Sequence, residues 1–272
     1  MNIVYAGNKN VFDGLLISLL SLVESNADSL KVYVLTMDLL DLDENYVSIP
    51  QGDLDFIGIE LRKVHPNSEI IRVDVEDLFR KKLGSSKNLT NRYTPYALLR
   101  LLLDEIAIIP DKVLYLDTDT VINKNISELY NIELKDYEYA AVRDRYGRFF
   151  FNPRYCNTGV LLLNMQKIRE TGLFDKVVNL LNKRKVFLSD QTGINKMTTK
   201  KKIISRKYNE QKVVKKDTVI RHFSMQFRIF PKFHFINVKP WNIDKVHNIY
   251  HCHEFDHILA RYQQLKTQRR IN

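Results

Sequence analysis

The chain has 272 residues, of which 44% are hydrophobic and 27% are charged, values typical of a soluble globular protein with one large domain or a domain and an appendage. Its two cysteines are too few for a disulfide framework, which favours a reducing compartment. The net charge of +10 lies in the C-terminal part: residues 201–272 hold 16 Lys or Arg against 5 Asp or Glu, whereas residues 1–200 hold 26 against 27. Such a basic part predicts either an anionic partner or a solvated basic face.

The first 26 residues, MNIVYAGNKNVFDGLLISLLSLVESN, carry no basic n-region and no small-residue cleavage site. Their apolar run is broken by serines and ends at Glu24, short of the ~20 residues that a membrane span needs. We therefore expect the protein to be cytoplasmic.

Strand-like and helix-like segments alternate from the first residues onward. The apolar patterns predict strands at 2–7, 31–38, 69–75 and 112–116, and helices at 13–26 and 95–107. This order predicts an α/β fold with a mostly parallel central sheet and helices on both faces, over residues 1–204. The remaining residues, 205–272, are predicted to form an appendage on this domain.

Two carboxylates, Asp117 and Asp119, follow the fourth predicted strand directly and are separated only by Thr118. Ligands of parallel sheets bind beyond the carboxyl ends of the strands, which is where this pair would lie. Two like charges so close are costly to bury unless a cation compensates them, and hard oxygen ligands suit Mn²⁺ or Mg²⁺. A turn with two Asx-type bends is the ordinary alternative.

The chain has neither G-x-G-x-x-G nor G-x-x-x-x-G-K-[ST], the loops that usually hold nucleotide phosphates. A nucleotide bound here would need a metal to hold its diphosphate. That is the chemistry of nucleotide-sugar glycosyltransferases, in which the cation also stabilises the leaving group.

With YAGNKN, YALLRLLL, the D-x-D pair, YCNTGVLLLN, LSDQTGIN and KPW in this order, residues 1–242 resemble glycosyltransferase family 8, whose enzymes retain the configuration of the sugar. The resemblance implies a GT-A, Rossmann-like fold that binds a nucleotide sugar. It also implies donor contacts by Ala6, Asn8, Asn10, Arg100, Asp117, Thr118, Asp144, Asn157, Gly159, Asp190, Gln191 and Lys239. Asp190 and Gln191 match the pair beneath the anomeric carbon. Taken singly, each of these residues also has an ordinary structural explanation, such as a surface charge, a helix cap or a turn.

The resemblance further implies that Asp117, Asp119 and a histidine bind the metal, for which Mn²⁺ is expected and Mg²⁺ is the alternative. Two histidines compete for the third position. His222 ends a strand-like run, whereas His234 is closer along the chain to Lys239. We favour His222, because a ligand at a strand end is held more firmly than a ligand in a loop.

The C-terminal segment EFDHILARYQQLKTQRR has an apolar helical face, which predicts that it caps the core, with contact to the inner face of a membrane as the alternative. The histidine-rich segment HNIYHCHEFDH could also bind zinc, although polar residues that screen a helix are more ordinary.

These observations together predict a Mn²⁺-dependent glycosyltransferase that moves a hexose from a UDP-sugar to a hydroxyl of a cell-surface glycan, glycolipid or glycoprotein with retention. Galactose is favoured and glucose is next. The aromatic segment RDRYGRFFFNPRY is expected to contact the acceptor. A metal-dependent nucleotidyltransferase and a non-catalytic nucleic-acid-binding module are the alternatives, and we expect no nucleic-acid partner.

Overall fold

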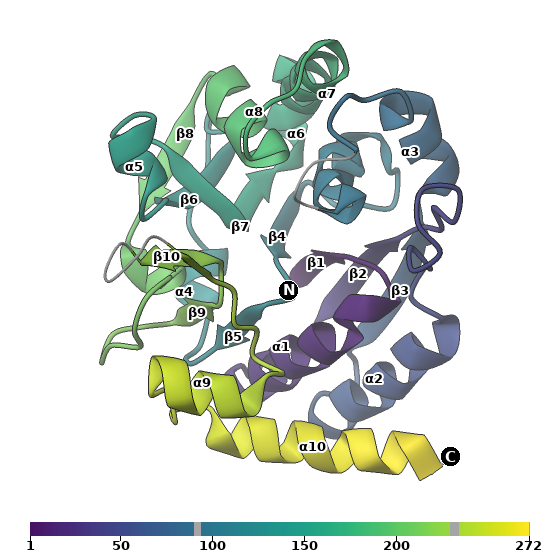
Figure 1. Ribbon diagram of the computed structural model, residues 1–272, viewed down its shortest axis with the longest axis vertical. Helices are drawn as coiled ribbons and strands as arrows, with labels where there is room; N and C mark the ends of the chain where they lie inside the picture. Colours follow the sequence, from purple (N-terminus) through teal and green to yellow (C-terminus); the bar gives the residue numbers. More distant parts are fainter. Residues whose placement is uncertain (90–93, 229–233, 272) are drawn as a thin grey trace.

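The computed structural model describes residues 1–89, 94–228 and 234–271. Its centre is a seven-stranded sheet of order β3-β2-β1-β4-β7-β6-β8, covered by helices on both faces (Figure 1). The strands are β1 (Asn2–Ala6), β2 (Lys31–Thr36), β3 (Glu69–Asp74), β4 (Lys112–Leu116), β6 (Tyr139–Arg143), β7 (Cys156–Asn164) and β8 (Lys201–Ile204). Neighbouring strands are parallel except at β7, which is antiparallel to β4 and β6. The predicted mostly parallel α/β sheet is confirmed.

Each face of the sheet has its own hydrophobic core, because successive side chains of a strand point to opposite faces. In β1, Ile3 and Tyr5 belong to one core and Val4 belongs to the other. The first core is completed by α1 (Phe12–Ser25), α2 (Gln51–Val64), α9 (Ile243–Tyr250) and α10 (Asp256–Ile271). The second is completed by α3 (Glu76–Leu83), the 3-10 helix η2 (Pro95–Glu105), α6 (Met165–Thr171), α7 (Leu173–Lys183) and α8 (Ser189–Met197).

The helix predicted at 95–107 is present but is wound as a 3-10 helix, with Pro95 in its first turn as expected. Shorter helical turns are η1 (Lys9–Val11), α4 (Ser127–Tyr130), α5 (Gly147–Phe150) and η3 (Arg206–Tyr208).

The segment after residue 204 packs on the main sheet domain and supplies part of its ligand-facing edge. Two small antiparallel ladders lie here, β5 (Thr120–Ile122) with β9 (Ile220–His222) and β10 (Gln226–Arg228) with β11 (His234–Ile236). The first ladder joins the segment to the chain just beyond the D-x-D pair. The division of the chain at residue 204 stays a prediction.

Helix α10 lies across α1 and α2 at the bottom of the view in Figure 1. Its apolar side chains Ile258, Leu259, Tyr262 and Leu265 are buried, as is Phe255 just before the helix, so the predicted capping of the core is confirmed. Lys266 forms an ion pair with Asp13, and Arg269 forms one with Asp53. The apolar face of α10 therefore packs against the core. The predicted membrane contact stays untested. No helix among the described residues is long and apolar enough to cross a bilayer.

Candidate active site

The D-x-D pair lies at the carboxyl edge of the sheet, where β4 ends between β1 and β7. The backbone N–H of Asp117 donates to the carbonyl of Gly159 on β7 at 2.8 Å, and the hydroxyl of Thr120 donates to the carbonyl of Asp117 at 2.8 Å. These bonds turn the chain sharply after β4. As a result, both carboxylates leave the sheet on the side where a ligand would bind.

The β5–β9 ladder brings a histidine to this pair. Its register sets Thr120 opposite His222, and the N–H of Phe223 donates to the carbonyl of Asp119 at 2.9 Å. The Nε2 atom of His222 lies 3.1 Å from a carboxylate oxygen of Asp119 and 3.7 Å from one of Asp117. The three ligand atoms lie within 4.8 Å of one another. The structure thus brings together Asp117, Asp119 and His222.

His234, the competing histidine, is exposed in the β10–β11 hairpin and is not part of this group. The choice of His222 over His234 as a metal ligand stays a prediction, and the geometry agrees with it.

The group has the ligand chemistry that a divalent cation requires. Two carboxylates and one imidazole are the oxygen and nitrogen ligands that suit Mn²⁺. A Cβ atom on Gly159 would lie 2.2 Å from His222 Cε1 and 2.6 Å from Asp117 Oδ2, so the absence of a side chain there lets these two ligands approach. The ammonium of Lys239 lies 2.5 Å from a carboxylate oxygen of Asp119. It supplies part of the positive charge that two neighbouring carboxylates require.

The charge of Asp119 is strongly stabilised by its neighbours. Burial alone opposes ionisation, but Lys239 and His222 outweigh it and hold the pKa of Asp119 well below its usual range. Asp119 is therefore an anion across the neutral pH range. A buried permanent anion beside a second carboxylate is the electrostatic setting in which a cation binds.

Arg100 ties the D-x-D pair to a third carboxylate. It is 4% exposed, and its guanidinium lies 2.8 Å from Asp117 Oδ1 and 3.2 Å from Asp190 Oδ2. It also stacks over the ring of Tyr115, 4.3 Å from the ring centroid. Burial opposes the charge of Arg100, but Asp117 and Asp190 outweigh it and raise its pKa. Arg100 is thus a fixed cation at the floor of the site.

The acid–amide pair lies in the first turn of α8. Burial raises the pKa of Asp190, and the attraction of Arg100 does not cancel this effect. The side-chain oxygen of Gln191 accepts hydrogen bonds from Asn157 Nδ2 at 3.1 Å and from the N–H of Thr158 at 3.2 Å. Both residues are therefore held in one orientation by β7 and by η2.

Asn157 connects most of the remaining polar groups. Its amide nitrogen donates to Asp144 Oδ2 at 3.1 Å, and its oxygen accepts from Asn209 Nδ2 at 2.9 Å and from the N–H of Gly159 at 3.0 Å. The side-chain oxygen of Asn209 accepts from His222 Nδ1 at 3.1 Å. An amide oxygen can only accept, so this contact leaves His222 Nε2 as the atom that faces Asp119.

Sequence reasoning missed Asn209, because it lies in none of the motifs that the sequence analysis recognised. Ala6 is the last residue of β1, and Asn8 and Asn10 follow it at the same edge of the sheet. Asn8 and Asn10 both donate to the carbonyl of Asn45 at 3.3 Å, so this part of the predicted donor site is held by the 38–48 loop.

The histidine-rich segment forms a second, more exposed group. His247 Nε2 lies 2.7 Å and His253 Nδ1 lies 3.1 Å from the carboxylate of Asp256. The thiol of Cys252 is buried, and burial raises its pKa to about 12, which disfavours the thiolate that zinc requires.

A sequence model of glycosyl transferase family 8 matches residues 2–245. The glycosyltransferase GlyA of Streptococcus pneumoniae is 40% identical over 87 residues, which are 31% of this chain and 12% of that protein. The lipopolysaccharide 1,2-glucosyltransferase of Escherichia coli is 29% identical over 224 residues, which are 76% of this chain and 62% of that protein. The matched part of the chain thus spans less than two thirds of either relative.

Among solved structures, the galactosyltransferase LgtC in complex with donor and acceptor sugar analogues superposes with a TM-score of 0.68 at 19% identity, covering 98% of this chain and 96% of that one. The glycosyltransferase GlyE of Streptococcus pneumoniae superposes with a TM-score of 0.65 at 21% identity, covering 96% of this chain and 63% of that one. These similarities show a shared fold, the GT-A fold expected from the sequence.

Proposed function

Because the chain belongs to glycosyltransferase family 8, we propose that it transfers a hexose from a UDP-sugar to a hydroxyl group of a glycan, with retention of configuration. Galactose is the favoured sugar and glucose the next. The acceptor is a glycan on a lipid or a protein. The two buried free cysteines agree with a reducing compartment such as the cytoplasm.

The group of Asp117, Asp119 and His222 carries the proposal. These three residues would hold Mn²⁺, with Mg²⁺ as the alternative. A bound cation there would neutralise charge on the diphosphate leaving group. The sequence has no glycine-rich phosphate loop, so we propose that this site takes its place in holding the diphosphate.

Lys239 adds a second positive charge for the leaving group. Its ammonium lies between Asp119 Oδ2, at 2.5 Å, and the carbonyl of Phe223, at 3.4 Å. Pro240 restricts the backbone of Lys239 to extended conformations, and Trp241 packs against the first core. The lysine is thereby delivered to one place, from which we propose that it contacts the diphosphate and stabilises the departing UDP.

Retention is best explained by attack of the acceptor on the same face that the UDP leaves. Asp190 is the candidate for a covalent nucleophile, but its carboxylate is buried and ion-paired with Arg100. The oxygen of Gln191 is occupied by two N–H donors and is a weak nucleophile. We propose that Gln191 and Asp190 bind the sugar and orient its anomeric carbon, and that the leaving phosphate accepts the proton of the acceptor hydroxyl.

The acceptor would enter beside α5. Phe149 and Phe150 are 74% and 70% exposed, and Phe151 stacks on Tyr155 with ring centroids 4.7 Å apart. Helix α5 is fixed to the site because the N–H of Gly147 donates to Asp144 Oδ1 at 2.6 Å. Exposed aromatic rings next to a polar site are well suited to stack on the apolar face of a sugar.

The direct test is to incubate the protein with Mn²⁺ and a panel of UDP-sugars and to measure the release of UDP. We expect release from UDP-galactose or UDP-glucose that stops when the metal is chelated and is absent in Asp119→Asn. Pyrophosphate release from UTP and a sugar 1-phosphate would instead identify a nucleotidyltransferase. Salt-dependent RNA binding without UDP binding would identify a nucleic-acid-binding module.

A further inference from the structure

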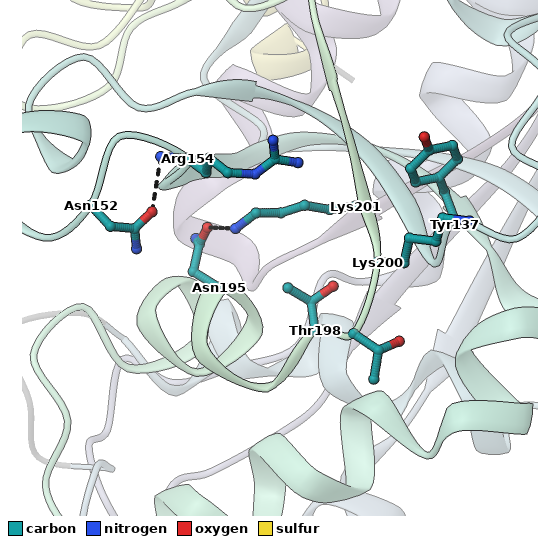
Figure 2. Close-up of a pocket in the computed structure, with 8 residues that line it drawn as sticks. Tyr137, Asn152, Arg154, Asn195, Thr198, Lys200 and Lys201 are labelled. Carbon is teal, nitrogen blue, oxygen red and sulfur yellow. Dashed lines mark hydrogen bonds between the residues drawn. The ribbon is translucent and has the colours of Figure 1, made fainter.

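A pocket of about 420 Å³ lies along the edge strand β8, and none of its lining residues belongs to the group of Asp117, Asp119 and His222 (Figure 2). Two of the lining residues, Asn152 and Arg154, belong to the aromatic segment that is expected to contact the acceptor. Its walls come from the loops before β6 and β7, from the end of α8 and from the start of β8. The lining residues are Tyr137, Asn152, Arg154, Asn195, Thr198, Thr199, Lys200 and Lys201. They include three cations and no carboxylate.

Lys201 is the unusual member, because it is buried to nine-tenths and yet has no counter-ion. Its ammonium donates to Asn195 Oδ1 at 2.7 Å (Figure 2), and no carboxylate of the described residues lies within ion-pairing distance of it. A neutral amide oxygen is a weak partner for a buried charge. Burying a cation without an anion is unfavourable by several kcal/mol, so an anion supplied from outside would be bound strongly.

The side chain of Asn195, which accepts from Lys201, is fixed by its other hydrogen bonds. Its oxygen also accepts from the N–H of Cys156 at 2.7 Å, and its nitrogen donates to the carbonyls of Cys156 at 2.7 Å and Gln191 at 2.9 Å. The ammonium of Lys201 is therefore held at a fixed point between α8 and β7, with two further N–H donors available to a ligand.

Arg154 is the second cation of the pocket. Its side chain runs beside that of Lys201 in Figure 2, and it forms no ion pair among the described residues. Burial is the main cause that lowers the pKa of Lys201; Cys156 opposes it, and the charge of Arg154 adds to it as a smaller contribution. The two cations therefore repel each other, and an anion between them would relieve this repulsion.

The other charges nearby are already paired. Lys200 lies 3.4 Å from the carboxylate of Asp136. Glu138, behind the pocket, accepts from the N–H and hydroxyl of Thr199 at 2.9 and 3.0 Å and from the N–H of Lys200 at 3.3 Å. The carboxylate of Glu138 is thus engaged by the α8–β8 connection and is unavailable to Lys201.

We propose that this pocket is an oxyanion-binding site, in which Lys201, Arg154 and the amide of Asn152 hold one phosphate or carboxylate group. The group is either a free ion or a substituent of an anionic sugar. Its binding would join the loop before β7 to the end of α8, one helical turn from Gln191. The proposal does not depend on the identity of the glycosyl donor.

Thermal unfolding in phosphate or chloride at equal ionic strength tests the site. Phosphate should raise the melting temperature of the wild type. It should do the same for the control variant Lys202→Met, because the ammonium of Lys202 lies outside the pocket and donates to the carbonyl of Glu133. The rise should be lost in Lys201→Met, with phosphate affinity lowered at least about tenfold. In chloride, Lys201→Met should melt above the wild type, because a buried uncompensated charge has been removed.

Arg154→Gln provides a second variant on an exposed side chain, and its phosphate affinity should fall several-fold. Replacing phosphate with glucose 6-phosphate, with glucose as the neutral control, distinguishes the sources of the anion. Tighter binding of the sugar phosphate would indicate an anionic glycan, and equal binding would indicate a free ion. The proposal is overturned if neither phosphate nor sugar phosphate stabilises the wild type more than chloride, or if Lys201→Met and Arg154→Gln respond as the wild type does.

Discussion

The substitution Gly159→Ala should disable the candidate metal site, although it replaces none of the three proposed ligands. The new Cβ atom would lie 2.2 Å from His222 Cε1 and 2.6 Å from Asp117 Oδ2. Ordinary contacts begin at 3.4 Å, so His222 would have to move by 3.4 − 2.2 = 1.2 Å and Asp117 by 3.4 − 2.6 = 0.8 Å. His222 is the last residue of β9 and Asp117 directly follows β4, so the two ligands would be pushed apart.

A misplacement of about 1 Å in a preorganised site can lower a rate by about 100-fold. We therefore expect UDP release to fall by about 100-fold and Mn²⁺ affinity to fall at least about tenfold. The crowding should also lower the free energy of unfolding by ~1–3 kcal/mol. Mn²⁺ affinity would be measured by titration calorimetry or by the electron paramagnetic resonance signal of free Mn²⁺.

Gly52→Ala is the matched control, because a Cβ atom there, on the exposed first turn of α2, meets no atom within 4 Å. It should leave Mn²⁺ binding and turnover unchanged and stabilise the helix by up to ~1 kcal/mol. The assignment is refuted if Gly159→Ala is folded, as judged by circular dichroism, and binds Mn²⁺ as tightly as the wild type.

Three further outcomes follow from the same site. In calorimetric titrations, His222→Ala should weaken Mn²⁺-dependent UDP binding by more than about tenfold and His234→Ala should leave it unchanged; the reverse order would move the third ligand to the β10–β11 hairpin. Lys239→Ala should lower both donor affinity and kcat, because a charge-assisted contact is worth about 1.5–3 kcal/mol. The control Lys266→Ala should alter only thermal stability. Equal effects of the two substitutions on donor affinity and kcat would show that Lys239 is merely part of a basic surface. Asn209→Ala should weaken Mn²⁺ binding about 10–100-fold and Asn209→Asp, which keeps an acceptor for His222, should restore most of it; no loss in the alanine variant would exclude a positioning role.

The four strands and two helices predicted up to residue 116 were predictable because each has a clear apolar period. The orientation of β7 could not be predicted from the sequence, because the apolar pattern of a fully buried strand is the same in either direction. Its antiparallel pairing with β4 and β6 depends instead on how the chain connects these strands. The 3-10 geometry of η2 could not be predicted from the sequence either. Its apolar pattern and Pro95 indicate a helix without distinguishing one helical geometry from another.

The candidate site was predictable wherever a residue belongs to a motif. Asp117, Asp119, Asp190 and Gln191 all lie in such segments, and the fold brings them to one edge. Asn209 carries no such signal, because an isolated polar residue between strands has many ordinary explanations. Only its three-dimensional contact with His222 connects it with the candidate site.

The central claim is that Asp117, Asp119 and His222 hold the cation that binds the nucleotide. It is tested most directly by anomalous diffraction from crystals grown with MnCl₂ and UDP. The account predicts one strong manganese peak within coordination distance of all three residues, with the diphosphate against its open side and near Lys239. A peak at His247, His253 and Asp256 with none at the D-x-D pair, or UDP bound elsewhere, would contradict it.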